Sequence, residues 1–476
     1  MDPRDQRIAE LEAELAVKDA RIEQLERKVE QLTQLVAELM EKLGQNSRNS
    51  HLPPSSDGPG GRSATQKTKT KSKRKRGGQR GHRGHKRGLL PLAQVDHVVE
   101  FYPDECENCW APLPESRDPN ATRYQVTDLP PISPETTEFR RNSVKCDCGH
   151  TTCAKVVGVI PASPFGPRLM SLISLLTGVY HLSRRQTVAL LNDVVGVQIS
   201  LGAISAVEAR VSDAIEPAVD EAWSKVNDAT VKHADATSWL QSGKLRSLWT
   251  IATKVATVFR IVVDGSADTI RPFFGACKGI LVSDRATVFS FWVMKRRQIC
   301  WAHLLRKFIS FSERDGPVHQ FGQELLDYAA LVFRYWQDHQ AGKLDKKTFR
   351  AWMTPVRTQV EECLERAAAA DIKKLSGSCA NIVDHKEALW TFVDRNDVEP
   401  TNNHAEREPR SFVLWRRRSF GSQSDNGNLF AERVMTVAHT ARKQDKNVLA
   451  FLTACCEAQL AKTDRPSLFA PQLAAA

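Results

Sequence analysis

The chain has 476 residues, of which 41% are hydrophobic and 26% charged, as is typical of a globular protein with several domains. No run of roughly 18 apolar residues occurs and the charged N-terminus has no apolar stretch, so we expect neither a membrane span nor a signal peptide. The net charge is +11, and residues 58–94 hold twelve Lys and Arg with no Asp or Glu, which leaves 11 − 12 = −1 elsewhere. This local cationic segment indicates a polyanionic partner, and a cytosolic location is expected by default.

Residues 1–43 carry an unbroken heptad repeat. Its alternating spacing of three and four residues keeps one seam largely apolar over about six heptads. Mostly β-branched residues at a, with Leu at d, favour a parallel two-stranded coiled coil, and so a homodimer; a lone amphipathic helix packed on the core is the alternative. The a positions are Ile8, Leu15, Ile22, Val29, Val36 and Leu43, and the d positions are Leu11, Lys18, Leu25, Leu32 and Leu39.

Residues 44–95 have the composition of a flexible linker, because their Gly, Pro, Ser and Asn cannot build a core. Within the linker, residues 67–87 are basic, rich in glycine and free of apolar side chains. Such a run is expected to contact DNA phosphates without reading sequence well, whereas a merely solubilising tail is the alternative. The predicted DNA contacts in this run are Lys73, Arg74, Lys75, Arg76, Arg80 and Arg83.

Eleven cysteines are too few for a disulfide scaffold, but four of them form two tight pairs. In a reducing compartment, Cys106-x2-Cys109 and Cys146-x-Cys148 indicate one structural Zn²⁺ held by four thiolates. The second pair is closer than the usual spacing, so His150 or Cys153 stays open as a replacement ligand. Ordinary reduced cysteines are the alternative. A further pair, Cys300-x2-His303, has no second half nearby, and we interpret it as a helix start rather than a ligand pair.

Two short helices, about 184–194 and 201–214, are predicted on either side of residues 196–200, with Ser183 and Ser200 as N-caps. This spacing is typical of a helix-turn-helix, and plain helical packing is equally open. Residues 301–395 have helical periodicity throughout. Two apolar faces are predicted there, formed by Phe321, Leu325, Ala329, Val332 and Trp336, and by Phe349, Trp352, Val356, Val360 and Leu364.

Between these helical regions the pattern changes to strands. Residues 231–235, 245–253 and 255–263 are predicted to form a meander, followed by a crossover and a fourth strand at 280–282, which makes a mixed sheet. Asp235 and Asp284 are placed at the ends of the first and fourth strands. Two carboxylates on adjacent strands repel one another unless a cation lies between them, and Mg²⁺ suits such oxygen ligands. A turn or cap role is the alternative for either residue.

These residues lie within a series of motifs that resembles the insertion-sequence sixty-six family of transposases, of the TnpC type. The resemblance extends over nearly the whole chain. The order and number of the motifs carry it, since each motif alone is only moderately specific. The motifs are residues 46–50, 53–57, 77–82, 233–235, 282–285, 300–306, 400–407 and 413–421.

The resemblance implies a ribonuclease-H-like core with a catalytic triad of Asp235, Asp284 and Glu406, all three being Mg²⁺ ligands. It places Glu406 on a helix after a helical insertion, which the 122 residues from Asp284 to Glu406 require. The cysteine pairs resemble the family's zinc-ribbon-like element. Further DNA contacts are predicted at Asn402, Asn403 and Arg407, and at Arg416 and Arg417 beside Trp415 in a strand-like segment.

Two positions depart from the family pattern. Ala236 replaces an acidic residue after Asp235, and Pro409 interrupts the segment after Glu406, so its helix is expected to be short or kinked. An inactive, decayed transposase that only binds DNA as a dimer is therefore one alternative. A nuclease that cuts without joining strands is another. Glu408, which would point about 200° away from Glu406 on a helix, is predicted to tolerate alanine.

The full prediction is a multidomain α+β protein. It is a DNA transposase that cleaves phosphodiesters at element ends and transfers the 3′-OH to target DNA, using two Mg²⁺ or Mn²⁺ ions and one structural Zn²⁺. Its partners are double-stranded DNA, a second copy of the chain and accessory proteins of the same element, with no membrane, in the bacterial cytoplasm at the nucleoid. The predicted domains are a coiled coil (1–43), a basic linker (44–95), a zinc-ribbon-like domain (96–160), a helical DNA-binding region (161–227), a first catalytic part (228–313), a helical insertion (314–395) and a last catalytic part with C-terminal helices (396–476).

Overall fold

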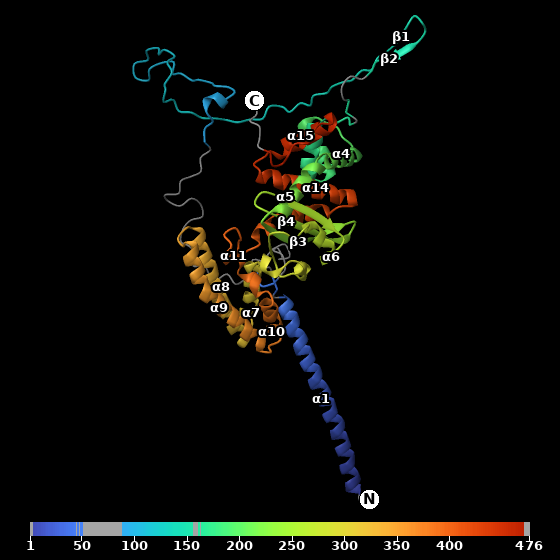
Figure 1. Cartoon of the computed structure of the whole chain (residues 1–476), viewed down its shortest axis with the longest axis vertical. Helices are drawn as coiled ribbons and strands as arrows, with labels where there is room; N and C mark the ends of the chain where they lie inside the picture. Colours follow the sequence, from blue (N-terminus) through green and yellow to red (C-terminus); the bar gives the residue numbers. More distant parts are fainter. Residues whose placement is uncertain are drawn as a thin grey trace. The chain divides into compact units, whose positions relative to one another are not determined.

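The computed structural model describes residues 3–43, 45–46, 48–50, 88–155, 160–161 and 163–470, with the side chains of 3–13, 37–38 and 41–42 left aside. The chain divides into two compact units (Figure 1). One comprises Met1–Arg62, Thr136–Asp193 and Val197–Ala476, and the other Ser63–Glu135 with Val194–Gly196. The basic run at 67–87, with its predicted DNA contacts, lies outside the described residues. Among the described residues, no helix is long and apolar enough to cross a membrane.

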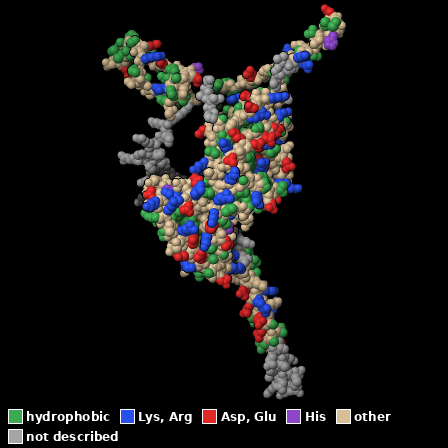
Figure 2. Space-filling model, in the orientation of Figure 1, with side chains coloured by type: hydrophobic (Ala, Val, Ile, Leu, Met, Phe, Trp, Pro, Cys, Tyr) green, Lys and Arg blue, Asp and Glu red, His purple; other side chains and the backbone are tan. Residues whose placement is uncertain are grey.

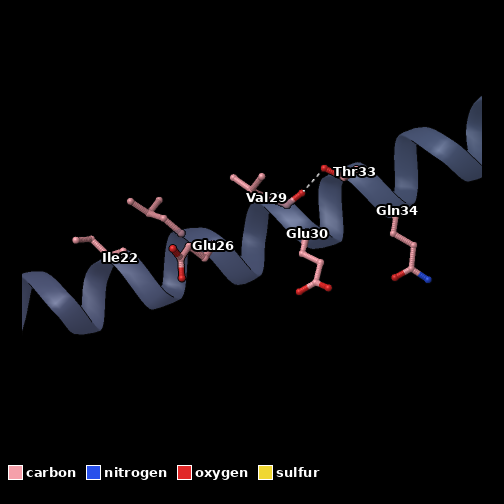
Figure 3. Close-up of a pocket in the computed structure, with 7 residues that line it drawn as sticks. Ile22, Glu26, Val29, Glu30, Thr33 and Gln34 are labelled. Carbon is pink, nitrogen blue, oxygen red and sulfur yellow. Dashed lines mark hydrogen bonds between the residues drawn. The ribbon is translucent and has the colours of Figure 1, made fainter.

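A single helix, α1 (Pro3–Leu43), covers the whole heptad segment. Its described a and d side chains are exposed, from 47% for Leu25 to 85% for Leu43. Figure 3 shows Ile22 and Val29 on one side of α1, with Glu30 and Gln34 projecting from the other. The sequence therefore predicted the extent of this helix correctly, and within one chain its apolar seam stays uncovered.

The smaller elements before the core are short. A 3-10 turn spans Leu92–Gln94 in one unit, and the hairpin of β1 (Ser143–Lys145) and β2 (Thr151–Cys153) belongs to the other. None of the residues described between 88 and 155 is buried. Apolar packing therefore contributes little to the order of this stretch.

The helical region before the sheet confirms the predicted helices and their caps. Ser183 accepts a hydrogen bond from the backbone N–H of Gln186 in a capping box, and Ser200 accepts one from Ala203. The buried face of α4 packs against α2, α14 and α15. The helices are α2 (Pro167–Ser174) with a π-helical extension Leu175–Val179, α3 (Arg184–Leu190) with a π-helical extension Leu191–Val195, α4 (Leu201–Ala214) and α5 (Glu216–Asp228).

The core is a five-stranded mixed sheet in the order β5-β4-β3-β6-β7. The three antiparallel strands form the predicted meander, and β6 and β7 are added parallel to β3. Ser242 and Gly243 make the two-residue turn between β3 and β4, and both have positive φ. The strands are β3 (Val231–Gln241), β4 (Lys244–Ala252), β5 (Thr257–Val262), β6 (Ile280–Ser283) and β7 (Arg297–Ile299), with short helical segments α6 (Ala267–Ile270), Arg271–Phe274, Thr287–Phe291 and Met294–Arg296 between them.

Two details of the sheet differ from the sequence prediction. The first strand continues six residues beyond Asp235, because β3 and β4 form a long hairpin. Asp235 therefore lies inside β3 and not at its end. What ends near Asp235 is the pairing of β3 with β6, which stops at His233. The second difference is β7, which was not predicted. Its residues Arg297 and Gln298 are buried, and a three-residue strand with buried polar side chains has no apolar periodicity.

Helix α14 (Asp425–Lys443) closes the open edge of β5 through side chains. Glu432, Thr436 and Thr440 accept hydrogen bonds from the backbone N–H groups of β5 at Ile261, Phe259 and Thr257. Four helical residues rise about 6 Å and two strand residues about 6.6 Å, so every fourth residue of α14 meets every second residue of β5. This contact keeps α14, and the residues that it carries, in register with the sheet.

The chain is helical where the insertion was predicted, between residues 317 and 394. The helices of this region share one buried cluster with β6, β7 and α7, and Figure 1 shows them grouped together. The predicted apolar faces are largely buried, but Trp352 is 46% exposed and lies edge-on to Tyr335. Helix α7 (Trp301–Ser312) precedes this region. The region itself contains α8 (Pro317–Gln340), α9 (Lys346–Ala369), α10 (Ser376–Val383), a 3-10 turn Lys386–Leu389 and α11 (Thr391–Asp394).

The last part of the chain returns to the sheet. Helix α12 (Asn403–Arg407) has five residues, and α13 (Arg410–Ser419) begins after Pro409, which confirms that the proline keeps the Glu406 helix short. Gly421 (φ +86°) follows, where a Cβ would lie 2.0 Å from the Leu240 carbonyl oxygen, so only glycine allows this segment to pair with β3. Helix α15 (Val448–Ala461) ends the fold. On the face drawn in Figure 2, cationic and anionic side chains are interspersed.

Candidate active site at the centre of the sheet

The three predicted carboxylates come from three separate parts of the chain. Asp235 is carried by β3, opposite Thr250 of β4. Asp284 directly follows β6, the parallel neighbour of β3, and its carboxylate accepts a hydrogen bond from the backbone N–H of Ala286. Glu406 is carried by α12, which packs against β3 and β4. The sheet therefore fixes two of the carboxylates, and a short helix brings the third.

Asn402 attaches the Glu406 helix to the sheet. Its side chain is fully buried, and its amide nitrogen donates to the Ala234 carbonyl oxygen at 2.8 Å, one residue before Asp235. Its amide oxygen lies 3.3 Å from Nδ1 of His233. Asn402 therefore positions α12, and its prediction as a DNA contact is corrected, because both ends of the buried amide are engaged with β3.

Cys300 links the same segment to the other strand. Its backbone N–H donates to the Ser283 carbonyl oxygen at 2.9 Å, one residue before Asp284. The backbone N–H of Asn402 in turn donates to the Cys300 sulfur at 3.1 Å. One chain of hydrogen bonds thus joins the neighbours of Asp235 and Asp284 to Asn402, whose carbonyl oxygen accepts from the backbone N–H of Glu406. This chain holds the three carboxylates in a fixed relation.

Buried Arg297 of β7 supports Asp284 from behind. Its guanidinium donates to the Asp284 carbonyl oxygen at 3.0 Å and to the Ser283 hydroxyl at 3.2 Å. The guanidinium also lies over the ring of Phe289, 5.7 Å from its centroid. Arg297 therefore fixes the backbone at Asp284 and leaves the Asp284 carboxylate available.

Asp235 lies within the electrostatic reach of the other two carboxylates. Burial, together with the negative charges of Glu406 and Asp284, raises the pKa of Asp235 to about 7. A shift of this size in a half-buried aspartate means that its ionised form lacks sufficient positive charge nearby. The arrangement is one that a bound cation would stabilise.

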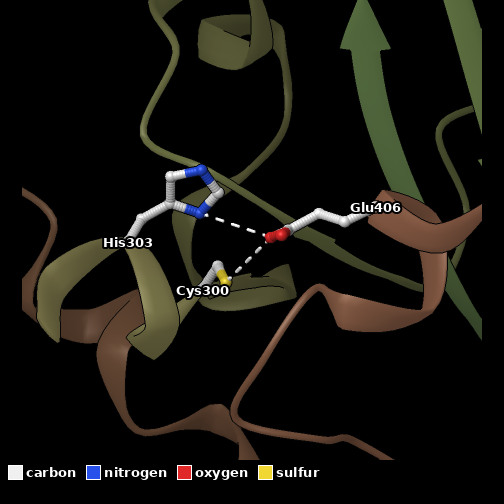
Figure 4. A group of neighbouring side chains, drawn as sticks. All are labelled: Cys300, His303 and Glu406. Carbon is white, nitrogen blue, oxygen red and sulfur yellow. Dashed lines mark hydrogen bonds and ion pairs between the residues drawn. The ribbon is translucent and has the colours of Figure 1, made fainter. Parts of the chain in front are cut away.

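Glu406 contacts three side chains, those of Cys300, which precedes α7, and of His303 and Arg306 within α7. Figure 4 shows the first two together with Glu406. Its Oε1 lies 3.6 Å from Sγ of Cys300 and 3.5 Å from Nδ1 of His303, and its Oε2 lies 3.4 Å from the Arg306 guanidinium. Burial raises the pKa of Cys300 to about 12 and lowers that of His303. The spacing of three residues puts all three groups on one helix face, so that each reaches the same carboxylate.

A second group of charges holds α12 from the side of α14. The Glu408 carboxylate forms a short hydrogen bond with His439 and an ion pair with Lys443 at 2.8 Å. Lys443 also donates to the Thr253 carbonyl oxygen at 2.8 Å, and its Nζ lies 3.0 Å from the His404 ring. Although burial alone would raise it, these partners lower the pKa of Glu408 to about 2. Glu408 therefore has a structural role, and its contacts lead us to expect that alanine at this position lowers stability.

The other predicted DNA contacts fall into two groups. Asn403, Arg407 and Arg417 are exposed, as a surface contact requires. Arg416 is half-buried and donates to Ser238 of β3, so part of its hydrogen-bonding capacity is used inside the fold. The segment that contains Trp415 is the helix α13 and not strand-like as predicted, and Trp415 is partly buried there.

The contacts of Trp415 explain this helix. Its ring stacks on His181 with centroids 4.9 Å apart and meets Trp239 edge-on at 5.9 Å. Trp239 donates its ring N–H to Asn428 of α14 at 3.0 Å. The aromatic residues thus join α13 to the sheet and to α14, and the Trp415 ring is engaged with His181 and Trp239.

The cysteine pairs, each within its own unit, form two turns with the same pattern of backbone hydrogen bonds. The N–H of Cys106 donates to the Ala111 carbonyl oxygen, and the N–H of Trp110 donates back to Cys106. In the second turn the N–H of Cys146 donates to His150, and that of Gly149 donates back to Cys146. In both turns, backbone N–H groups lower the pKa of the first thiol. The Cys146-x-Cys148 pair therefore forms the same kind of turn as Cys106-x2-Cys109, with one residue fewer.

Sequence patterns missed the residues that assemble the site. Arg297, Asn402 and Arg306 act through contacts between residues roughly 15 to 170 positions apart, and no local pattern encodes such a contact. One signal was present, since the Cys300-x2-His303 spacing places both residues on one helix face. The structure brings Glu406 to the same two side chains.

Comparison with known proteins gives two family matches. Residues 162–429, more than half of the chain, match the family described as "Transposase IS66 family". Residues 1–88 match a family of unknown function, DUF6444. No curated protein matches the chain.

Proposed function

The chain belongs to the IS66 family of transposases, and we propose that it cleaves phosphodiesters at the ends of its element and joins the freed 3′-OH to target DNA. Asp235, Asp284 and Glu406 form the catalytic triad. The observation that carries this proposal is the placement of the three carboxylates: Asp235 on β3, Asp284 directly after its parallel neighbour β6, and Glu406 on α12, which packs against β3. In keeping with it, burial and the charges of Glu406 and Asp284 raise the pKa of Asp235 to about 7. Three acidic groups from distant segments that act on one another are expected where a cation and a phosphate are bound.

The sheet order supports a ribonuclease-H-like core. Three antiparallel strands are followed by two parallel ones on the other side of β3, and the acidic residues lie on β3, after β6 and on a helix that returns after a helical insertion. Such a sheet places residues of β3 and β6 side by side without help from loops. The positions are therefore rigid, as a site for phosphoryl transfer requires.

The donor set fits Mg²⁺ or Mn²⁺, because all three groups offer carboxylate oxygen. A pair of such ions, when bound, would activate the attacking oxygen and stabilise the leaving oxygen of an in-line displacement. The protein's own residues orient this site. Asn402 holds the Glu406 helix against β3, Arg297 fixes the backbone at Asp284, and Arg306 holds one oxygen of Glu406.

DNA contact is assigned to exposed cations and amides near the triad and to the basic run. Asn403 and Arg407 flank Glu406 on α12 and are exposed, and Arg417 is exposed on α13. Together with residues 67–87 they would bind phosphates and so position the duplex without specifying its sequence. The helical region 161–227 is proposed to contribute to recognition of the element ends.

The chain is proposed to act as a homodimer joined by α1. Its described a and d side chains, apolar except for Lys18, form one exposed seam along a 41-residue helix, and Glu26 lies beside it. A second copy of the same helix would cover this seam by knobs-into-holes packing. The occupant is a second copy because the heptad is self-complementary.

One structural Zn²⁺ is proposed for the two cysteine turns. Their matching backbone hydrogen bonds, and N–H groups that favour the thiolate of the first cysteine in each, suit a thiolate–zinc site. The described residues between 88 and 155 include none that is buried, so a metal would supply order that apolar packing does not.

The test is cleavage and strand joining on DNA that carries the element ends, with Mg²⁺ or Mn²⁺. We expect Asp235→Asn, Asp284→Asn and Glu406→Gln each to reduce both steps by orders of magnitude while binding of the ends persists, because each removes a charge that holds the metal. The matched controls are the exposed acids Asp268→Asn and Glu399→Gln, which should retain activity.

The outcomes separate the alternatives. If the triad variants match wild type, the catalytic assignment is wrong. Cut but unjoined products from wild type would identify a nuclease. A wild type that binds the ends but is inert with both metals would identify a decayed transposase, and Ala236→Glu with Pro409→Leu would then be the variant to examine.

A further inference from the structure

Cys300, His303 and Glu406 bring a thiol, an imidazole and a carboxylate together. The three ligand atoms all lie within 4.8 Å of one another, and this is the one such group of three or more found among the described residues. Figure 4 shows the three side chains converging from α7 and α12. Cys300 is fully buried, whereas the side chains of His303 and Glu406 are 13% and 18% exposed. The group is thus closed on the thiol side and open on the other.

The two separations that involve Glu406 are close to the edges of a zinc tetrahedron. With Zn–S near about 2.3 Å and Zn–O and Zn–N near about 2.0 Å, tetrahedral angles give S···O near about 3.5 Å and N···O near about 3.3 Å. The observed separations from Oε1 of Glu406 are 3.6 Å to Sγ of Cys300 and 3.5 Å to Nδ1 of His303. Small movements of these side chains would therefore suffice to place a zinc ion between them.

One contact of the sulfur favours a metal-bound thiolate, against the burial and the Glu406 charge that raise the pKa of Cys300 to about 12. The backbone N–H of Asn402 points at the Cys300 sulfur at 3.1 Å, and such N–H···S bonds stabilise the thiolate form. On zinc binding, the thiol proton would pass to solvent, because the thiolate is the ligand. The other oxygen of Glu406 stays with Arg306, so the carboxylate would bind zinc through Oε1 alone.

We propose that Cys300, His303 and Glu406 form a second zinc site, with its fourth position open to water, and that zinc bound there competes with the catalytic Mg²⁺ for Glu406. Sulfur and imidazole nitrogen favour zinc over Mg²⁺, which prefers oxygen alone. Zinc is therefore an inhibitor of the transposase. The competition rests on the proposed catalytic role of Glu406, whereas zinc binding itself does not.

The binding test counts zinc in the full-length protein after removal and re-addition of metal, with each variant checked for folding by its far-ultraviolet spectrum. We expect two zinc ions per wild-type chain, one after Cys300→Ser, and one after Cys109→Ser with Cys148→Ser. The matched control Cys379→Ser removes another buried cysteine and should keep two.

A second variant guards against misfolding of the first. His303→Ala should weaken zinc at this site by more than about 100-fold, since even residues behind a ligand cost 10- to 100-fold. Co²⁺ added to the Cys109→Ser, Cys148→Ser protein should give a thiolate-to-cobalt absorption band that Cys300→Ser abolishes. The same stoichiometry and the same band with and without the Cys300 thiol would overturn the proposed site.

The competition has its own test. Micromolar zinc should reduce Mg²⁺-dependent cleavage by wild type at least 10-fold, excess Mg²⁺ should restore it, and Cys300→Ser should lose most of this sensitivity relative to its own zinc-free rate. Equal inhibition of both proteins would overturn the competition. If no protein cleaves DNA under any condition, the proposed transposase chemistry fails, while the zinc count and the cobalt band still decide whether the site exists.

Discussion

Replacing Glu408 by alanine removes the carboxylate that joins the end of α12 to α14. Glu408 is two residues from Glu406, and its side chain is 13% exposed, as against 15% for Lys443 and 14% for His439. The substitution would leave the Lys443 ammonium buried without its carboxylate partner. It also loosens the contact by which α14 supports α12, so stability and metal binding at Glu406 should fall together.

The structure gives the size of the effect in two ways. Removing one partner of a buried ion pair typically costs about 3–5 kcal/mol. Independently, the pKa of Glu408 lies at about 2 instead of 4.5, despite burial, because of the His439 hydrogen bond and the Lys443 charge. At about 1.4 kcal/mol for each tenfold change in proton binding, this corresponds to about 3 kcal/mol. The two values agree, so we expect a loss of about 3 kcal/mol.

The pH dependence has a definite sign. The folded-state pKa of Glu408 is depressed, so its contribution is fully present above the unfolded value of about 4.5 and is lost as the pH falls from about 4.5 to about 2. Wild type and Glu408→Ala should therefore differ most at neutral pH. Their stabilities should approach one another as the pH falls through this window.

The assay is thermal unfolding of the full chain at pH 7. A loss of about 3 kcal/mol in a core of this size lowers Tm by roughly 8 °C. Glu399→Ala, an exposed acid in the same region, is the control and should change Tm by about 1 °C or less. A decrease of under about 2 °C for Glu408→Ala would refute the reasoning, as would a double-mutant cycle with Lys443→Met in which the two changes are additive.

Three further predictions concern other parts of the chain. Deleting residues 1–43, or the single change Leu25→Pro, should reduce the dimer to a monomer in sedimentation, and an unchanged stoichiometry would exclude the coil as the assembly device. If about half of the cations in residues 67–87 contact phosphates, deleting this run should reduce the slope of log DNA affinity against log salt concentration by roughly 5. An unchanged slope would mean that the run is only a spacer. Burial raises the pKa of Glu432 to about 7, so the stability that the protonated side chain contributes is lost as the pH rises from about 4.5 through 7. In chemical unfolding, Glu432→Gln should therefore leave the free energy of unfolding unchanged at pH 4 and raise it by up to about 3 kcal/mol at pH 8. The same stability difference at both pH values would contradict that pKa.

Local periodicity was sufficient wherever an element is stabilised mainly by its own pattern. The heptad gave the full length of α1, alternating apolar residues gave the meander, and Ser183 and Ser200 gave two helix starts, because caps and periodicity depend on neighbours three or four residues apart. The interruption at Pro409 was predictable for the same reason, since a proline acts on its own helix.

The sequence by itself determined the mixed α+β class and the family, which the family match confirms. The three acidic positions stay a prediction, and the third of them came from the resemblance alone. Only the tertiary structure decided how the site is held together. Asn402 was expected at the surface and is buried between Ala234 and His233, and Cys300 was expected to start a helix and also contacts Glu406. The physical reason is that a short segment is too short for a periodic pattern to show which of its polar side chains are buried. The partner of such a side chain is chosen by the packing of strands and helices that lie more than a hundred residues apart, and that packing brings the third carboxylate to the first two.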